Sequence, residues 1–191
     1  PLYFGGLGAP RMTFGKPEWF DQVASEVKAA HETAALFEQS TLGKIWVEGA
    51  DAEVFLNRVC ANDMSRPPGR AIYTAMLDER GGFVEDLTVQ RITTNQYRLF
   101  VGSGAPTKAM GWLRRQRREG EKVLFEDETE DFVVLGLMGP QTAHIAVNLG
   151  ASDLNDIRFF SHAEAEIDGI PVRAVRLSYV GEQGWEITCA Q

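Results

Sequence analysis

Two short segments of the chain place carboxylates among apolar and aromatic residues. In GGFVEDLTV, residues 81–89, Glu85 and Asp86 are adjacent within a run that reads as a strand. Strand parity divides the run into two faces, with Phe83, Glu85, Leu87 and Val89 on one and Val84, Asp86 and Thr88 on the other. Glu85 and Asp86 therefore cannot enter the same pocket. Parity alone fits a solvated edge strand and a functional acid equally well.

The second segment is YVGEQGWEI, residues 179–187. Its two glycines predict a tight turn, and a turn explains them without any ligand. In a strand that begins at Gly184, Glu186 points away from Trp185 and Ile187. A single carboxylate beside aromatic residues also suits a flat heterocycle, because it accepts two adjacent N–H donors in parallel hydrogen bonds. Tyr179 then supplies a ring face or a hydroxyl.

Other patterns disfavour several kinds of site. The arginines of WLRRQRRE, residues 112–119, predict a solvated helix face rather than a phosphate or polyglutamate dock. VGSGAP, residues 101–106, lacks both GxGxxG and GK[ST], and Ser103 lacks a GxSxG context, so neither a dinucleotide site nor a nucleophilic triad is expected. The three histidines, His31, His144 and His162, show no metal-ligand spacing and are predicted to be structural.

Composition limits the partners and the compartment. With 19 Lys and Arg against 27 Asp and Glu, the 191-residue chain carries a formal net charge of -8, which argues against nucleic acid or an anionic membrane as partner. No apolar run approaches the roughly 18 residues of a membrane span. Cys60 and Cys189 have no CxxC spacing, which predicts reduced thiols in a reducing compartment.

The elements that must position these residues are mixed in type. Strand and turn patterns predict three antiparallel strands, within 70–77, 83–92 and 97–102, and a closing hairpin of 170–179 and 184–189. Further strands are expected at 44–49, 122–127 and 131–139, and helices within 16–30, 50–60, 105–120 and 139–150. The first helix is expected to dock on a sheet, and Asp51 to cap the second. The fold class is therefore α+β, with mainly antiparallel sheets and flanking helices.

Four segments in order, 31–63, 69–89, 135–141 and 176–187, resemble the folate-binding aminomethyltransferase family over nearly the whole chain. The resemblance implies a lead segment and N-terminal helix at 1–40 and a partial folate-binding domain at 41–191, as a fragment of a longer protein. GSG at 102–104 and GWE at 184–186 resemble the C-terminal half of dimethylglycine and sarcosine dehydrogenases.

The resemblance implies tetrahydrofolate as the ligand and assigns roles by motif. Asp86 corresponds to the catalytic acid beside the folate N5 and N10. Tyr179 and Glu186 correspond to residues that hold the pterin, with Glu186 on its N–H edge. Ser103 stands where the glycine-cleavage branch has an asparagine that contacts folate.

The implied function is capture of the one-carbon unit of an N-methylglycine as 5,10-methylenetetrahydrofolate. FAD is expected only in an upstream flavin domain of the same polypeptide, in bacterial cytoplasm or mitochondrial matrix, and the fragment alone can be inactive. One alternative is the aminomethyltransferase, or T-protein, of glycine cleavage. Another is a non-catalytic iron-sulfur assembly factor, whose KGCYxGQE motif has a cysteine that LSYVGEQGWE lacks.

Overall fold

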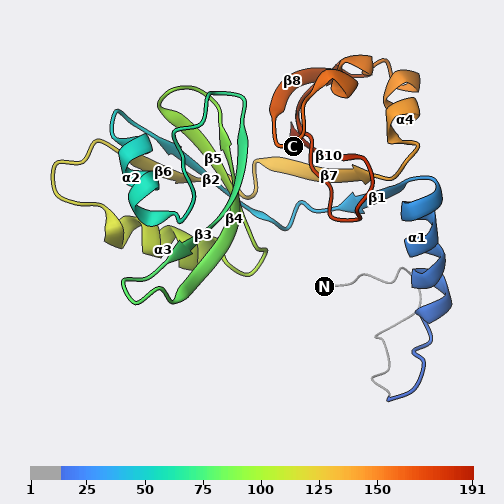
Figure 1. The fold of residues 1–191 in the computed structure, drawn as a ribbon, viewed down its shortest axis with the longest axis horizontal. Coiled ribbons are helices and arrows are strands. Elements are labelled where there is room, and N and C mark those ends of the chain that lie inside the picture. The colour runs from blue at the N-terminus through green and yellow to red at the C-terminus, as the bar shows by residue number, and fades with distance from the viewer. Residues whose placement is uncertain (1–13) are drawn as a thin grey trace.

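The computed structural model describes residues 14–191, which form two five-stranded antiparallel sheets lying side by side (Figure 1). The first sheet has the order β3-β4-β5-β2-β6, with β2 Gly43–Glu48, β3 Ala71–Leu77, β4 Phe83–Arg91, β5 Gln96–Val101 and β6 Leu124–Asp127. The second has the order β1-β7-β10-β9-β8, with β1 Ala35–Glu38, β7 Phe132–Met138, β8 His162–Ile167, β9 Ile170–Val175 and β10 Gly184–Ala190. The predicted α+β class is confirmed.

Each sheet buries one face beneath helices. α2 (Ala52–Val59) and α3 (Pro106–Gln116) cover the first sheet, and the apolar side chains of both enter a core with β2, β4 and β5. α4 (Thr142–Asn148) and the short 3-10 helix η1 (Ser152–Asp156) cover the second sheet around the fully buried Trp185. The Trp185 indole N–H donates to the carbonyl of Leu154 at 3.0 Å, which satisfies its one polar group.

A β-bulge interrupts the hairpin of β3 and β4. Leu77 pairs with Phe83, but Met76 pairs with Glu85, so Val84 is an extra residue in β4. Val84 consequently enters the core, whereas Phe83 is 64% exposed. The predicted faces of these two residues are therefore wrong, because the extra residue reverses the alternation before Glu85.

A seam of backbone hydrogen bonds joins the two sheets. The seam consists of residues 69–71 from the first sheet and 160–162 from the second. Ala71 donates to the carbonyl of Phe160 at 3.0 Å, and His162 donates to that of Gly69 at 2.8 Å. Beside the seam, Ala71 packs with Val175 and Leu177 in a small apolar cluster. These contacts fix β3 and β4 relative to β9.

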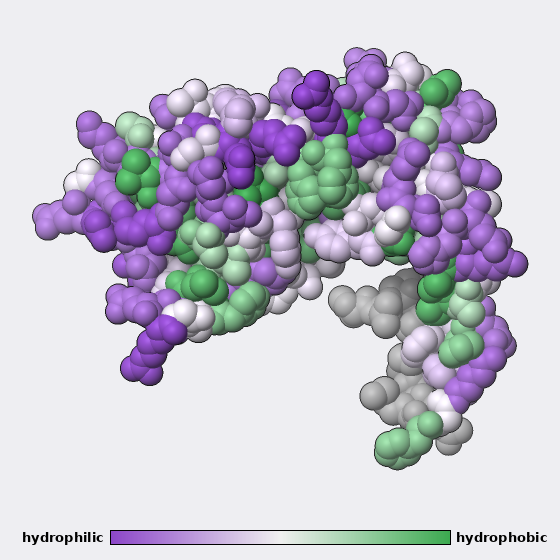
Figure 2. Space-filling view, in the orientation of Figure 1, coloured by the Kyte–Doolittle hydropathy of each residue, from purple (hydrophilic) through white to green (hydrophobic). Residues whose placement is uncertain are grey.

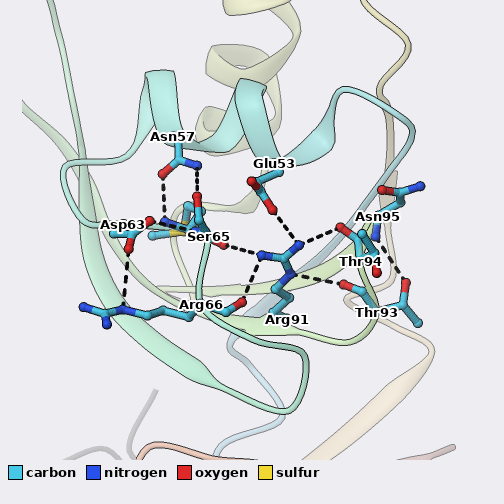
Figure 3. A network of polar contacts seen from close by, with 10 residues as sticks. Glu53, Asn57, Asp63, Ser65, Arg66, Arg91, Thr93, Thr94 and Asn95 are labelled. Carbon is cyan, nitrogen blue, oxygen red and sulfur yellow. Dashed lines mark hydrogen bonds and ion pairs between the residues drawn. The ribbon is translucent and has the colours of Figure 1, made fainter.

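Arg91, at the end of β4, holds the loop before the seam in place (Figure 3). Its buried guanidinium forms an ion pair with Glu53 of α2 at 2.5 Å and donates to four carbonyls, those of Met64, Arg66, Thr93 and Thr94. Its own carbonyl accepts a hydrogen bond from His162 Nε2 at 2.9 Å. Burial lowers the pKa of His162 to about 4, so the imidazole is neutral at physiological pH.

Lys44 joins β2 to the beginning of β7. The side chain is fully buried, and its Nζ donates to the carbonyls of Ser40, Thr129 and Phe132 at 2.8, 2.7 and 2.8 Å. All three ammonium donors are thereby satisfied. Burial lowers the pKa of Lys44.

Several features differ from the sequence predictions. Among the residues of α1 (Phe20–Glu32) only Ala30 is buried, so the prediction that this helix docks on a sheet is wrong. The helix projects from the second sheet (Figure 1), and its hydrophobic and hydrophilic surfaces lie on different sides (Figure 2). Asp51 precedes α2, but its carboxylate accepts the backbone N–H of Lys122 at 2.8 Å instead of capping the helix.

Two strands and η1 were not predicted. β1 has only four residues, and β8, with the sequence HAEAEI, is rich in alanine and glutamate, which disfavour strands intrinsically. β1 lies before residue 40 yet pairs with β7, and the predicted division at residue 40 stays a prediction. No helix in residues 14–191 is long and apolar enough to cross a membrane.

We predict that Lys44→Met lowers the free energy of unfolding by about 3 kcal/mol, because three partly buried carbonyls lose their charged donor. Urea denaturation followed by circular dichroism measures the change. Lys28→Met is the control, since the Lys28 side chain is 69% exposed, and it is expected to shift stability by less than about 0.5 kcal/mol. Equal effects of the two substitutions would contradict the assigned role of Lys44.

Candidate functional site

Four side chains, one from each of three strands and one from a loop, gather on the inner faces of the sheets, opposite the faces covered by helices. Tyr73 comes from β3, Asp86 from β4, Tyr179 from the loop between β9 and β10, and Glu186 from β10. We call these four residues the carboxylate cluster. Three of them, Asp86, Tyr179 and Glu186, were predicted to share a site.

The bulge in β4 brings Tyr73 to Asp86. Beyond the bulge Tyr73 pairs with Thr88, so Tyr73 shares a face with Asp86, and its hydroxyl donates to Asp86 Oδ2 at 2.6 Å. This hydrogen bond raises the pKa of Tyr73 and the negative charge of Asp86 adds to the shift. Glu85 lies on the other face, where its carboxylate is 3.5 Å from Nζ of Lys108. Asp86 is thus the acid that faces the second sheet.

Sequence reasoning missed Tyr73. A regular hairpin through the turn at 78–82 would have placed Tyr73 opposite Leu87 on the helix-covered face, and only the bulge changes this register. The sequence offered no local signal for this change of register, and only the structure shows that Tyr73 is exposed on the inner face.

Glu186 is the most deeply buried member of the cluster. The residue is 3% exposed, and its side-chain carboxyl group has no hydrogen bond or ion pair with any residue in the described part of the chain. Its neighbours in register, Gly136 and Val175, offer no side-chain donor. Burial raises the pKa of Glu186 to about 7, because the ionised form loses its hydration. A lone buried carboxyl group with a shifted pKa is typical of a binding or catalytic position.

Tyr179 is 67% exposed. Partial desolvation raises the pKa of Tyr179, and the negative charges of Glu186 and Asp86 raise it further, although a hydrogen bond with Thr88 lowers it. The hydroxyl group of Tyr179 is therefore within electrostatic range of both acids.

The glycines of the second segment serve the turn, as predicted. Gly181 has φ +83°, which favours glycine, and a Cβ on Gly184 would lie 2.8 Å from Met138 Cγ. Glu182, between them, lies 3.5 Å from Nδ1 of His31 and belongs to the turn. The turn therefore delivers Tyr179 and Glu186 to the same side of the second sheet.

Ser103 is not in contact with the cluster. It is exposed in the turn after β5, two residues beyond Val101, which pairs with Leu87 next to Asp86. Its folate contact stays a prediction.

Two surface cavities flank the cluster. One, of about 350 Å³, is lined by Tyr73 together with Arg66, Arg70 and Phe160. The other, of about 590 Å³, follows the turn from Leu177 to Gly184. Among residues 14–191, no group of three or more histidine, cysteine or acidic side chains could hold a metal ion. The cluster can accept hydrogen bonds from a ligand, and it can hold or release a proton at Glu186.

The two sheets with their helices and polar inner faces define an α+β protein with the aminomethyltransferase fold. Over residues 1–191 the sequence matches the family described as the GCVT N-terminal domain, and the chain belongs to this family.

Individual relatives agree with this assignment. An aminomethyltransferase of Bacillus pumilus is 33% identical over 99% of this chain and 53% of its own length, and a probable aminomethyltransferase of Thermococcus gammatolerans is 32% identical over 90% and 44%. The chain thus spans about half the length of the curated relatives it matches.

Solved structures show the same fold. The glycine cleavage system aminomethyltransferase T from Bartonella henselae has a TM-score of 0.78 and 27% identity, over 87% of this chain and 45% of that one. A heterotetrameric sarcosine oxidase from Corynebacterium sp. U-96 has a TM-score of 0.60 over 90% of this chain and 85% of that one. Its 17% identity supports the fold alone.

We predict that Glu186 makes stability fall as pH rises. The unfolded chain releases this proton near pH 4.5 and the folded chain near 7, so the folded state binds more protons between these values and loses stability across them. The loss is of the order of 3 kcal/mol. His162, whose pKa is lowered to about 4, acts in the opposite direction and makes stability rise with pH over part of this range. The test is therefore the difference in unfolding free energy between the wild type and Glu186→Gln, which should change by this amount between about pH 4 and pH 8 in urea titrations. Glu166→Gln, at an exposed position of β8, is the control and should keep the wild-type dependence.

Proposed function

We propose that the carboxylate cluster binds tetrahydrofolate and that the chain takes part in one-carbon transfer to it. The observation that carries this proposal is the burial of Glu186 without a partner, beside Tyr179 and within the same cluster as Asp86. Membership of the GCVT N-terminal domain family and the similarity to aminomethyltransferases support it.

The chemistry of the cluster fits a reduced pterin. The ring presents adjacent N–H and amino donors, which the Glu186 carboxylate can accept in two parallel, charge-assisted hydrogen bonds. Tyr179 and Tyr73 provide aromatic surface beside it. Desolvation, which makes the free carboxylate of Glu186 costly, also strengthens its hydrogen bonds once a ligand supplies the donors.

Tetrahydrofolate would supply the nucleophilic nitrogen that accepts a one-carbon unit, leading to 5,10-methylenetetrahydrofolate. Asp86 is the group we assign to the chemistry, because its carboxylate can take up a proton or stabilise developing positive charge. Tyr73 donates to one Asp86 oxygen, Oδ2, which restricts the carboxylate and leaves Oδ1 for the ligand. Tyr73 is thus a positioning residue.

For the donor of the one-carbon unit we favour an N-methylglycine oxidised by a flavin domain of the same polypeptide. This proposal rests on the resemblance of GSG at 102–104 and GWE at 184–186 to dimethylglycine and sarcosine dehydrogenases. The second candidate is aminomethyl transfer in glycine cleavage, favoured by the names of the relatives about 33% identical to this chain. Flavin absorbance in the purified full-length gene product, bleached by sarcosine or dimethylglycine, would support the first, and its absence the second.

Calorimetric titration of the 191-residue chain with tetrahydrofolate tests the binding proposal. Glu186→Gln should weaken binding by about tenfold or more, because the amide replaces a charge-assisted acceptor. Asp86→Asn should leave affinity within a few-fold but lower one-carbon transfer by about 10² to 10⁴ in the enzyme that contains this domain. The proposal fails if both variants keep wild-type affinity and rate. The exposed Glu166→Gln serves again as control.

Binding should also depend on pH through Glu186. The pterin donors require the ionised carboxylate, whose pKa in the free protein is about 7. Affinity is therefore expected to rise by up to about tenfold per pH unit below pH 7 and to level off above it, with up to one proton released per ligand bound below pH 7 and none well above it. Calorimetry in buffers of different ionisation enthalpy measures this release. In Glu186→Gln the release should vanish, and its persistence would assign the proton to another group.

A further inference from the structure

A further polar cavity, separate from the two described above, lies where the inner faces of the sheets approach each other. It has a volume of about 320 Å³ and opens where β5 of the first sheet approaches β9 and β10 of the second. Its polar lining comes from Arg98, Glu164, Arg173 and Thr188. None of these residues belongs to the carboxylate cluster.

The strand register builds one wall of this cavity. Glu164 pairs with Arg173 and Arg173 pairs with Thr188, so the three side chains form a row across β8, β9 and β10. Arg98 reaches this row from β5. The cavity is therefore defined by regular strands of both sheets rather than by loops.

Thr188 carries a hydroxyl that the protein does not use. The residue is 3% exposed, and its Oγ1 has no hydrogen-bond partner among residues 14–191. A buried hydroxyl without a partner lowers stability, and valine would fill the same strand position without that loss. The unused hydroxyl therefore points to a ligand in the cavity.

The guanidinium groups of Arg98 and Arg173 bring positive charge and N–H donors to the cavity that the Thr188 hydroxyl also lines. Arg98 is 9% exposed and, within the described residues, the only hydrogen bond of its guanidinium group runs from Nε to Glu128 at 2.8 Å. Arg173 donates to His162 Nδ1 at 3.1 Å and pairs with Glu164 at 2.5 Å. Burial lowers the pKa of Arg173, and the nearby charge of Arg98 lowers it further although Glu164 opposes this. An anion between the guanidinium groups would relieve that repulsion.

We propose that Arg98, Arg173 and Thr188 bind a small monocarboxylate in this cavity. Planar guanidinium groups match the planar carboxylate, and the hydroxyl can donate to one of its oxygens. Glu128 and Glu164 already compensate much of the positive charge, so the cavity favours a singly charged ligand over a dianion such as phosphate. This inference is independent of the folate proposal.

Titration of the 191-residue chain with sodium acetate, followed by amide chemical shifts, tests the inference. Sodium chloride at equal ionic strength is the reference. Saturable shifts around Thr188 and Arg173 are expected with acetate and not with chloride, and phosphate should bind more weakly than acetate. Identical responses to acetate and chloride, or tighter binding of phosphate, would overturn the proposal.

Two variants separate ligand binding from a structural role. Thr188→Val is β-branched like threonine, so it should keep the strand and unfold at the same or a higher urea concentration, yet bind acetate about tenfold more weakly or worse. Thr188→Ser keeps the hydroxyl and should retain acetate affinity within about threefold. If Thr188→Val folds and binds acetate like the wild type, the hydroxyl has no role in the cavity and the proposal is wrong.

Discussion

The relative position of the two sheets depends on the seam of backbone hydrogen bonds between residues 69–71 and 160–162. Asp86 and Glu186 are 100 positions apart and lie on different sheets, so the seam determines whether their carboxyl groups meet. Phe160 lies in this seam with φ +50°, a costly conformation for a bulky side chain. Hydrogen bonds of its N–H and of its carbonyl hold Phe160 in this conformation. The backbone strain is therefore a consequence of the hydrogen bonds that join the two sheets.

The outer faces of the two sheets are apolar and the inner faces are polar, so the two kinds of face have different roles. The outer faces, beneath the helices, contain the two large apolar cores and supply most of the hydrophobic stabilisation. The inner faces carry acids, hydroxyls, an amide and arginines, several of them buried without a partner. Because side chains alternate along each strand, residues 184–190 contribute to both faces: Trp185 and Ile187 enter the apolar core, while Glu186 and Thr188 lie on the polar inner face.

Alternation in the sequence was sufficient to predict the class of fold, the meander of β3 to β5 and the position of Glu186 opposite Trp185 and Ile187. The choice of Asp86 over Glu85 came from the family resemblance, because alternation separates the two acids without saying which one faces a site. It could not reveal Tyr73, because a single extra residue, Val84, sets the register and no local pattern marks a bulge. β8 escaped prediction for a different reason. Its alanines and glutamates favour a helix, and only pairing with β9 makes it a strand. The expected docking of α1 failed because an amphipathic pattern does not specify what covers its apolar side.

Lys44 gives the junction of β2 and β7 an unusual chemical robustness. The direct partners of its ammonium group are peptide carbonyls, which neither take up protons in mild acid nor carry a net charge for dissolved ions to screen. Ion pairs such as that of Lys16 and Asp21 have no such protection, because both groups are exposed and the acid can be neutralised. Acid or concentrated salt would therefore weaken exposed ion pairs such as that of Lys16 and Asp21 well before it separates β2 from β7.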